Sequence, residues 1–457
     1  MILPKPRIRR WAPLAACLGL AIGLPFLAQA PETMAQTSSG FRQFIEALRP
    51  EAEAQGVSRA TFDAAFQEVE ADLSLPDLVL PGRAQGEVKG QAEFTRTPAE
   101  YLNAGYLANL AAQGRALRAK YAEVLAKIER EIGVPGEVVL AIWGRESAFG
   151  SHRSPHYAIR ALATQAWLGR RKELFRTELI YALKMLEDGV RTRATMNASW
   201  AGAMGLTQFM PSEYYTLAYD LDGDGRKDIW TSVPDALASA ANQLRARGWM
   251  PGQPWAFEVR LPADASCRLE GPERARSVRE WTKLGVVRTR GRAFPDSVLE
   301  AQAFVLAPGG AHGPTFLALE NFMVIKRYNM SDLYALFVGD LSDRIAGAGT
   351  FEVPWGAVRQ LSTRGIEEIQ EKLQARGYAI SKVDGKAGMN TRALIGDYQY
   401  ASRLKVDCWP SEALLGHLRR AAAADGAANK SAGTAADRAA RPAAVKGPLG
   451  ATAVGAK

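Results

Sequence analysis

The sequence predicts a mainly α-helical protein with more than one domain, and three observations lead to this fold class. Apolar residues recur at three- and four-residue spacing over several long segments, which is the period of an amphipathic helix. Prolines and glycines divide these segments into helices of ordinary length. The chain has 457 residues, 47% of them hydrophobic and 23% charged, which suits roughly two or three globular domains.

Residues 1–30 are expected to be a secretory signal peptide and not part of the globular fold. A positively charged segment, 5–10, precedes an apolar stretch, 11–27, and Ala-Gln-Ala at 28–30 suits a signal peptidase. The run Leu-Ala-Ala-Cys that ends at Cys17 also matches a bacterial lipoprotein box. We therefore expect export to the periplasm, with membrane association only if the chain is lipidated or keeps its signal.

Two helical segments are expected next. Phe41 to Val69 carries apolar residues at helical spacing and divides near Ser58, a residue type that favours a helix N-terminus. Tyr101 to Ile132 has a second apolar stripe. Its members are Leu107, Leu110, Leu117, Tyr121, Leu125 and Ile128. We expect both stripes to be buried.

The middle and the end of the chain continue this pattern. Pro135 suits the first turn of a helix that ends near Gly150. Further helices are expected over 174–189, 234–248 and 315–338, and short strands or irregular structure over 255–260 and 286–307. Glycines and a proline predict a linker over 343–357, a small module follows over 358–418, and the tail 419–457 is expected to be disordered.

Glu146 is an ionisable residue at the end of an apolar helical segment. Val139, Ile142 and Trp143 precede it at helical spacing, on the same face of the helix. Contact with these side chains removes water from the carboxyl group, so we expect its pKa to be raised. An acid that stays protonated near neutral pH suits glycosidic bond cleavage, whereas an ordinary ion pair at a helix end is the alternative.

Two further motifs follow Glu146 in the chain. Ser199 to Tyr214 combines small residues, which permit close approach to the backbone, with aromatic ones, although a packing turn uses the same residues. The last motif consists of Lys326-Arg327-Tyr328-Asn329, followed by Ser331, Asp332 and Tyr334. Together the three motifs resemble the lytic murein transglycosylases of the membrane-bound B type, over roughly residues 40–340.

This resemblance implies a lysozyme-like catalytic domain over 40–342 and cleavage of peptidoglycan between N-acetylmuramic acid and N-acetylglucosamine without water. It implies that Glu146 is the catalytic acid and base. It also implies substrate-binding roles for Ser199, Gln208, Asn329 and Tyr334. The serine and asparagine would orient the muramyl substituents, and the other two would line the groove. The family carries threonine where this chain has Ser147, which keeps the hydroxyl group.

The chemistry of a single carboxyl group is consistent with this reaction. A hydrolase needs two carboxylates, but the nearest candidates, Glu213 and Asp332, more readily make a helix cap or a surface contact. One carboxyl group suffices if the C6 hydroxyl of the muramyl sugar attacks its own C1, because a tethered nucleophile has a high effective molarity. This reaction requires no cofactor.

A possible metal site is separate from these motifs. Asp220, Asp222 and Asp224 offer oxygen at positions one, three and five of a calcium loop, and glycine stands at position six. The usual glutamate at position twelve is absent, and the resemblance implies that Asp235 completes a structural calcium site. A solvated turn is the alternative.

The module over 358–418 resembles a small three-helix peptidoglycan-binding domain. Its pattern Asp-Gly-x-x-Gly-x-x-Thr, over 384–391, is expected to form a glycine-dependent turn between helices. Such a domain gives an enzyme a second attachment to an insoluble polymer.

Charge and cysteine content limit the expected partners. The net charge of +9 suits an acidic partner. For an exported chain this favours peptidoglycan glycan strands, with other cell-wall enzymes as further partners and no nucleic acid. Cys267 and Cys408 can pair in an oxidising compartment, but their separation in sequence leaves this open.

The sequence therefore predicts a periplasmic lytic transglycosylase, a carbon–oxygen lyase that remodels and turns over the cell wall by forming 1,6-anhydro ends. A hydrolytic muramidase that uses water, and a catalytically silent wall-binding protein, are the alternatives. Glu146, Ser199 and Asn329 argue against a silent protein, which has no need of an acid in an apolar pocket.

Overall fold

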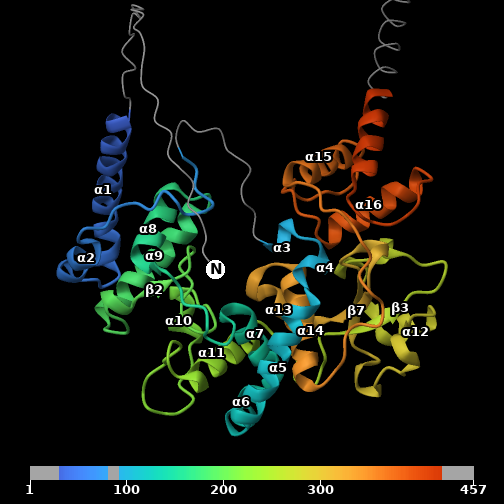
Figure 1. Ribbon diagram of the computed structural model, residues 1–457, viewed down its shortest axis with the longest axis horizontal. Coiled ribbons are helices and arrows are strands. Elements are labelled where there is room, and N and C mark those ends of the chain that lie inside the picture. Colours follow the sequence, from blue (N-terminus) through green and yellow to red (C-terminus); the bar gives the residue numbers. More distant parts are fainter. Residues whose placement is uncertain (1–29, 81–91, 425–457) are drawn as a thin grey trace, which may run out of the picture.

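The computed structural model describes residues 30–80 and 92–424, with side chains from 38 and from 94 onward. Two helical groups, a five-stranded sheet and a small C-terminal module make up the fold (Figure 1). The expected signal peptide and Cys17 lie outside the described residues, apart from Ala30, which begins the first helix. Within the described part, no helix is both long and apolar enough to cross a membrane.

The first helical group brings together two separate parts of the chain. It consists of α1 (Ala30–Ala54), α2 (Arg59–Phe66), α8 (Ala158–Leu168), α9 (Lys172–Glu187) and α10 (Pro211–Leu217). Its core encloses Phe41, Phe62 and Phe175, which are almost fully buried. Ser58 begins α2 by accepting the backbone N–H of Thr61, so the chain divides where the sequence predicts.

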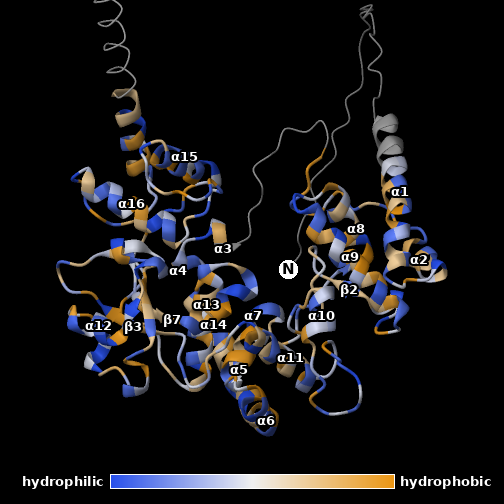
Figure 2. Ribbon diagram, turned by 180° about the vertical axis from the view of Figure 1, so that it is seen from behind, coloured by the Kyte–Doolittle hydropathy of each residue, from blue (hydrophilic) through white to orange (hydrophobic). Residues whose placement is uncertain are grey.

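The second helical group surrounds one buried helix. Its members are α5 (Ala104–Lys120), α6 (Ala122–Ile132), α7 (Gly136–Ser147), α11 (Val233–Ala246), α13 (Glu320–Asn329) and α14 (Asp332–Ala346), with the short helices α3 (Ala92–Thr95) and α4 (Pro98–Tyr101) against α14. Every residue of α7 from Val138 to Gly144 is buried, because α5, α11 and α14 pack around it. Figure 2 shows that the outer helices α5 and α6 are instead partly hydrophilic.

The sheet has the strand order β4-β6-β7-β3-β5, and all its neighbouring strands are antiparallel. The strands are β3 (Ala256–Arg260), β4 (Arg276–Ser277), β5 (Val287–Arg288), β6 (Gln302–Leu306) and β7 (Thr315–Leu319), and α12 (Val278–Lys283) follows β4. The prediction of helix over 315–319 was wrong, since β7 is the central strand. Its run of five residues is too short and too evenly apolar for periodicity to separate strand from helix. A separate ladder pairs β1 (His156–Tyr157) with β2 (Asn197–Ala198).

The C-terminal module contains α15 (Thr363–Gln374), α16 (Met389–Ala401) and a further helical segment over 412–424. Gln370 holds the turn between the first two helices. Its amide nitrogen donates to Asp384 and Thr391, and its amide oxygen accepts the backbone N–H of Asp384. The tail expected to be disordered begins inside the last helix, since residues 419–424 are helical, and its remainder lies outside the described residues.

The segment expected to be a linker, 343–357, is packed against the sheet. It begins inside α14, which continues to Ala346. Glu258 of β3 accepts the backbone N–H groups of Glu352 and of the residue after it. Trp355 packs so closely on Gly313 that a methyl group there would overlap its ring. These contacts fix the path between the two domains.

Covalent and ionic links also join the module to the sheet region. Cys267 and Cys408, 141 residues apart, form a disulfide. Next to it, the Arg268 guanidinium pairs with Asp397 of α16 at 2.8 Å. The pairing that the sequence left open is therefore present, and the module is docked on the segment that follows β3.

Candidate active site

Glu146 is the penultimate residue of α7 and is half-buried. The helix ends sharply, because Ala148, Phe149 and Gly150 all adopt positive φ angles of 47°, 57° and 82°. Two adjacent non-glycine residues in this region are uncommon and indicate that packing holds the turn. The Phe149 ring meets Trp143 edge to face, with ring centroids 5.5 Å apart. The carboxyl group therefore stands where a buried helix stops against aromatic side chains.

Tyr334 makes the most direct contact with this carboxyl group. Its hydroxyl donates a hydrogen bond of 2.5 Å to Glu146 Oε1. Tyr334 lies in the first turn of α14 and is completely buried. Burial, together with the nearby carboxylate, raises the pKa of Tyr334 well above its ordinary value of 10. The phenol therefore remains protonated and serves as a donor.

Arg145 places a half-buried positive charge beside the site, and sequence reasoning missed it. Its guanidinium donates to the Tyr101 hydroxyl at 2.7 Å and lies over the rings of Tyr101 and Phe337. Burial lowers the pKa of Arg145, but the neighbouring Tyr101 and Glu146 oxygens raise it by more, so the group stays charged. A basic residue next to the candidate acid is the only signal in the sequence that could have drawn attention to it.

The Ser199 to Tyr214 motif is joined to the end of α7 by hydrogen bonds. The Ser147 hydroxyl donates to the Leu206 carbonyl at 2.7 Å and accepts the backbone N–H of Gly150 at 3.1 Å. A methyl group on Gly205 would come within 2.7 Å of a backbone carbonyl oxygen, so only glycine fits this turn. The hydroxyl kept at Ser147 therefore has a structural use.

The third motif is attached to the same turn. Tyr328 of α13 donates its hydroxyl to the Thr207 carbonyl at 2.8 Å, and its ring stacks on Tyr334, with centroids 6.1 Å apart. All three sequence motifs therefore meet around the end of α7, although they are far apart in the chain.

The other residues predicted to bind substrate make different contacts. The Ser199 hydroxyl accepts the backbone N–H of Ala203 and closes its own turn. Gln208, in a left-handed conformation, donates to the Gly205 carbonyl at 3.0 Å. Asn329 ends α13, and its half-buried side chain has no hydrogen-bond partner among the described residues. Of the four predicted residues, only Tyr334 contacts Glu146 directly.

The two nearby acidic residues are both held by cations. Glu213 accepts the backbone N–H of Met210 as a helix cap and pairs with Arg247 at 2.6 Å. Asp332 does not make the surface contact considered from the sequence, because it is buried at the start of α14 and pairs with Lys326 at 2.8 Å. Both carboxylates are thus engaged away from Glu146.

The candidate calcium loop brings three of its four predicted residues together. Carboxylate oxygens of Asp220, Asp222 and Asp235 lie within 4.8 Å of one another. Asp235 is buried, and burial raises its pKa. Asp224 is not part of this cluster, and its carboxylate accepts the backbone N–H of Arg226. Three converging carboxylate oxygens match the ligands that calcium prefers.

Family models match most of the chain. A model described as a transglycosylase SLT domain matches residues 40–343, and one described as a putative peptidoglycan binding domain matches residues 362–418. The membrane-bound lytic murein transglycosylase B of Escherichia coli (strain K12) is 32% identical over 230 residues. That alignment covers 50% of this chain and 61% of the relative, so the chain spans less than two thirds of that protein.

Solved structures resemble the chain over a longer region. SltB3 from Pseudomonas aeruginosa, in complexes with NAG-anhNAM-pentapeptide and with NAG-NAM-pentapeptide, is 41% identical with a TM-score of 0.75, and the match covers 83% of this chain and 99% of that one. The Escherichia coli lytic transglycosylase Slt35 in complex with calcium is 25% identical with a TM-score of 0.53, covering 68% and 93%. The expected fold class, a mainly α-helical, lysozyme-like domain with a small second domain, is confirmed.

Proposed function

Because the chain belongs to the transglycosylase SLT domain family, we propose that it is a lytic transglycosylase that cleaves the MurNAc–GlcNAc β-1,4 bond of peptidoglycan and leaves 1,6-anhydro-MurNAc ends. The observation that carries this proposal is the hydrogen bond from Tyr334 to Glu146, at the end of a buried helix. A single carboxyl group with a fixed donor suits a reaction in which one residue acts first as acid and then as base.

In the proposed mechanism, Glu146 first protonates the glycosidic oxygen as the bond to C1 of muramic acid breaks. Its carboxylate then accepts the proton of the C6 hydroxyl of the same sugar, which attacks C1 and closes the anhydro ring. Tyr334 donates to the carboxylate form and so stabilises it between the two steps. Because Glu213 and Asp332 are both paired with cations, no second carboxylate is assigned a role.

The remaining predicted residues are proposed to bind the sugar strand. The Asn329 side chain has no partner among the described residues, so its amide is available to a substituent of the muramyl sugar. Ser199 and Gln208 belong to the turn that ends beside Glu146, and both side chains also hold that turn together. Their proposed contribution is therefore to shape the groove as well as to contact the sugar.

A structural calcium ion is proposed for the loop after α10. Asp220, Asp222 and Asp235 would be its carboxylate ligands, and Asp224 would contribute only if the loop rearranged. The calcium complex of Slt35 supports this proposal by similarity. When bound, the ion would neutralise the converging carboxylates and fix the loop, and no step of the reaction passes through it.

The proposed location is the periplasm, with cell-wall remodelling and turnover as the role. The disulfide between Cys267 and Cys408 supports an oxidising compartment. The peptidoglycan-binding module would add a second attachment to the wall. Anchoring to a membrane through a lipid on Cys17 or a retained signal is the alternative to a released protein.

The first prediction concerns the catalytic residue. Glu146→Gln should lower the rate of digestion of isolated sacculi by roughly 10²–10⁴-fold or more, since a positioned general acid contributes that much. Mass spectrometry of the released fragments is the measurement. A transglycosylase gives anhydro products that are lighter by one water than the products of a muramidase.

Glu137→Gln provides a matched control at the opposite end of α7, where this residue pairs with Arg118. It should leave the rate within about twofold, because this partly exposed ion pair lies at the far end of the helix from Glu146 and touches none of its partners. Turnover by Glu146→Gln close to that of Glu137→Gln would refute the assignment, and products carrying the extra water would favour the muramidase.

A further inference from the structure

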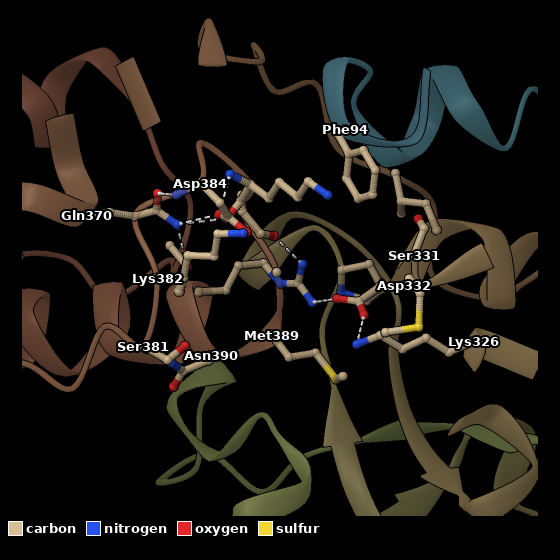
Figure 3. Close-up of a pocket in the computed structure, with 18 of the residues that line it drawn as sticks. Phe94, Lys326, Ser331, Asp332, Gln370, Ser381, Lys382, Asp384, Met389 and Asn390 are labelled. Atoms are coloured by element: carbon tan, nitrogen blue, oxygen red, sulfur yellow. Dashed lines mark hydrogen bonds and ion pairs between the residues drawn. The ribbon is translucent and has the colours of Figure 1, made fainter. Parts of the chain in front are cut away.

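A pocket of about 520 Å³ lies where the C-terminal module meets the catalytic domain. One wall comes from α3 and from the turn between α13 and α14, and the other from the loop between α15 and α16 (Figure 3). Phe94 and Lys326 belong to the first wall, and Lys382 and Asn390 to the second. Neither domain forms this pocket alone.

The floor of the pocket is a completed network of buried charges. Arg392 of α16 pairs with Glu270 at 2.6 Å and with Asp332 at 3.2 Å, and Asp332 also pairs with Lys326 at 2.8 Å. Arg392 and Glu270 are almost fully buried. These charges satisfy one another, so the floor is held in place without a ligand.

The rim of the pocket carries positive charges that, unlike those of the floor, are exposed to solvent. Arg96, Lys382 and Lys386 are exposed and form no ion pair within the described part of the chain. The Lys386 ammonium lies 3.8 Å from the centre of the Phe94 ring, across the junction between the domains. Figure 3 shows Phe94 on one side of the pocket and Lys382 on the other. Glu273 and Asp384 also line the pocket, but the Asp384 carboxylate accepts a hydrogen bond from Gln370, so these three cations leave an excess of positive charge at the rim. An excess of positive charge around a concave surface favours a ligand with carboxylates.

We propose that this junction pocket binds the peptide stem of peptidoglycan, an inference that rests on the proposed function. In a glycan strand whose lactyl groups carry peptides, the sugars are neutral and the carboxylates belong to the stems. The volume lies within the range of roughly 300–1,000 Å³ that is usual for small-ligand sites. It therefore suits part of a short peptide and not a second glycan strand.

The position of the pocket connects it to the active site. The turn between α13 and α14 lines the pocket through Lys326 and Asp332, and the same two helices carry Tyr328 and Tyr334 toward Glu146. A strand held at Glu146 and anchored through a stem at the junction gains a second contact within one molecule, which raises its effective concentration.

The test uses the full-length, disulfide-bonded protein with Glu146→Gln, so that binding is measured without turnover. The probes are NAG-NAM-pentapeptide, the free pentapeptide and stem-free chitotetraose, and isothermal titration calorimetry gives each Kd. Lys382→Gln with Lys386→Gln should weaken binding of both stem-bearing probes about tenfold and leave chitotetraose unchanged.

A charge-matched control is Lys283→Gln with Lys405→Gln, two exposed lysines outside the pocket. It should change each Kd by less than about twofold. The proposal would be overturned if the pocket variant bound the stem probes with unchanged affinity, or if the control variant lost as much affinity as the pocket variant. It would also be overturned if the pocket variant lost as much affinity for chitotetraose, because that result would indicate a sugar site. Because catalysis is not measured, failure here is distinct from failure of the Glu146 assignment.

Discussion

The hydroxyl group of Tyr334 favours the carboxylate form of Glu146. A donor at 2.5 Å stabilises the carboxylate and so opposes the effect of the apolar helix around it. The raised pKa expected for Glu146 from its apolar neighbours therefore stays a prediction. The apolar helix favours the protonated carboxyl group, whereas the Tyr334 hydroxyl and the nearby Arg145 charge favour the carboxylate, and the proposed role as both acid and base requires both forms.

Removing this hydroxyl is the second prediction. Tyr334→Phe should lower kcat/KM about 10- to 100-fold, because a hydrogen bond to a charged group is worth about 1.5–3 kcal/mol. The alkaline limb of the pH–rate profile should move to higher pH, since the lost bond favoured the carboxylate. A full pH profile on a soluble muropeptide substrate is the measurement.

Tyr328→Phe is the control for this variant, because it removes a stacked tyrosine hydroxyl that donates only to a backbone carbonyl. Its pH–rate limbs should stay in place. Identical profiles for the two variants would contradict a specific role for the Tyr334 hydroxyl.

Single residues also show the limit of sequence reasoning. Tyr334 was selected through a family resemblance, but its bond to Glu146 spans 188 residues and depends on how α14 packs against α7. The sequence pattern did not indicate that Arg145 lies at the site, because a charged residue in a helix is usually on the surface. Tertiary contacts of this kind cannot be derived from local pattern.

At the scale of elements, helices were easier to predict than the sheet. The division near Ser58 and the helix after Pro135 follow from local capping and periodicity. β7 was missed because its five residues are too short and too evenly apolar to show a period, and one of its two partner strands, β3, lies far from it in sequence. The linker was expected from glycine and proline, yet Trp355 packs it on Gly313, in the connection between β6 and β7.

The third prediction concerns the acidic loop as an element. Calcium should raise the Tm of chelator-treated protein by a few degrees, since a ligand at about 100 times its Kd contributes about 2.7 kcal/mol. Asp235→Asn should abolish this shift, because its buried carboxylate joins the cluster. Differential scanning calorimetry with calcium and with magnesium is the measurement.

Asp224→Asn decides whether the fourth predicted ligand takes part. Its carboxylate lies outside the cluster, so most of the calcium shift should remain in this variant. If calcium does not change the Tm of the unmodified protein, the proposal of a calcium site is refuted.

At the scale of the whole molecule, the two domains depend on each other for charge balance. Glu270 of the catalytic side is fully buried, and its main cationic partner, Arg392, comes from the module. The sequence showed two domains joined by a linker and gave no sign of this pairing. Partners 122 residues apart are brought together only by docking.

The fourth prediction tests this dependence. Arg392→Met should lower the free energy of unfolding by about 3–5 kcal/mol, because it leaves a carboxylate buried without its cation. Arg268→Met removes the more exposed pair across the same junction and should cost about 1 kcal/mol or less. Urea denaturation of both variants with the disulfide intact gives the comparison. Equal losses of unfolding free energy in the two variants would show that the buried pair contributes no more to stability than the exposed one.

The separation of Glu146 and Tyr334 along the chain has a consequence for biosynthesis. A polypeptide is made from its N-terminus, so the acid is synthesised first and the hydroxyl that holds it follows 188 residues later. Any nascent chain or proteolytic fragment that ends before α14 lacks that donor and the helix that packs on α7. The candidate site is thus complete only after about three quarters of the chain has been made, since α14 ends at Ala346 of 457 residues.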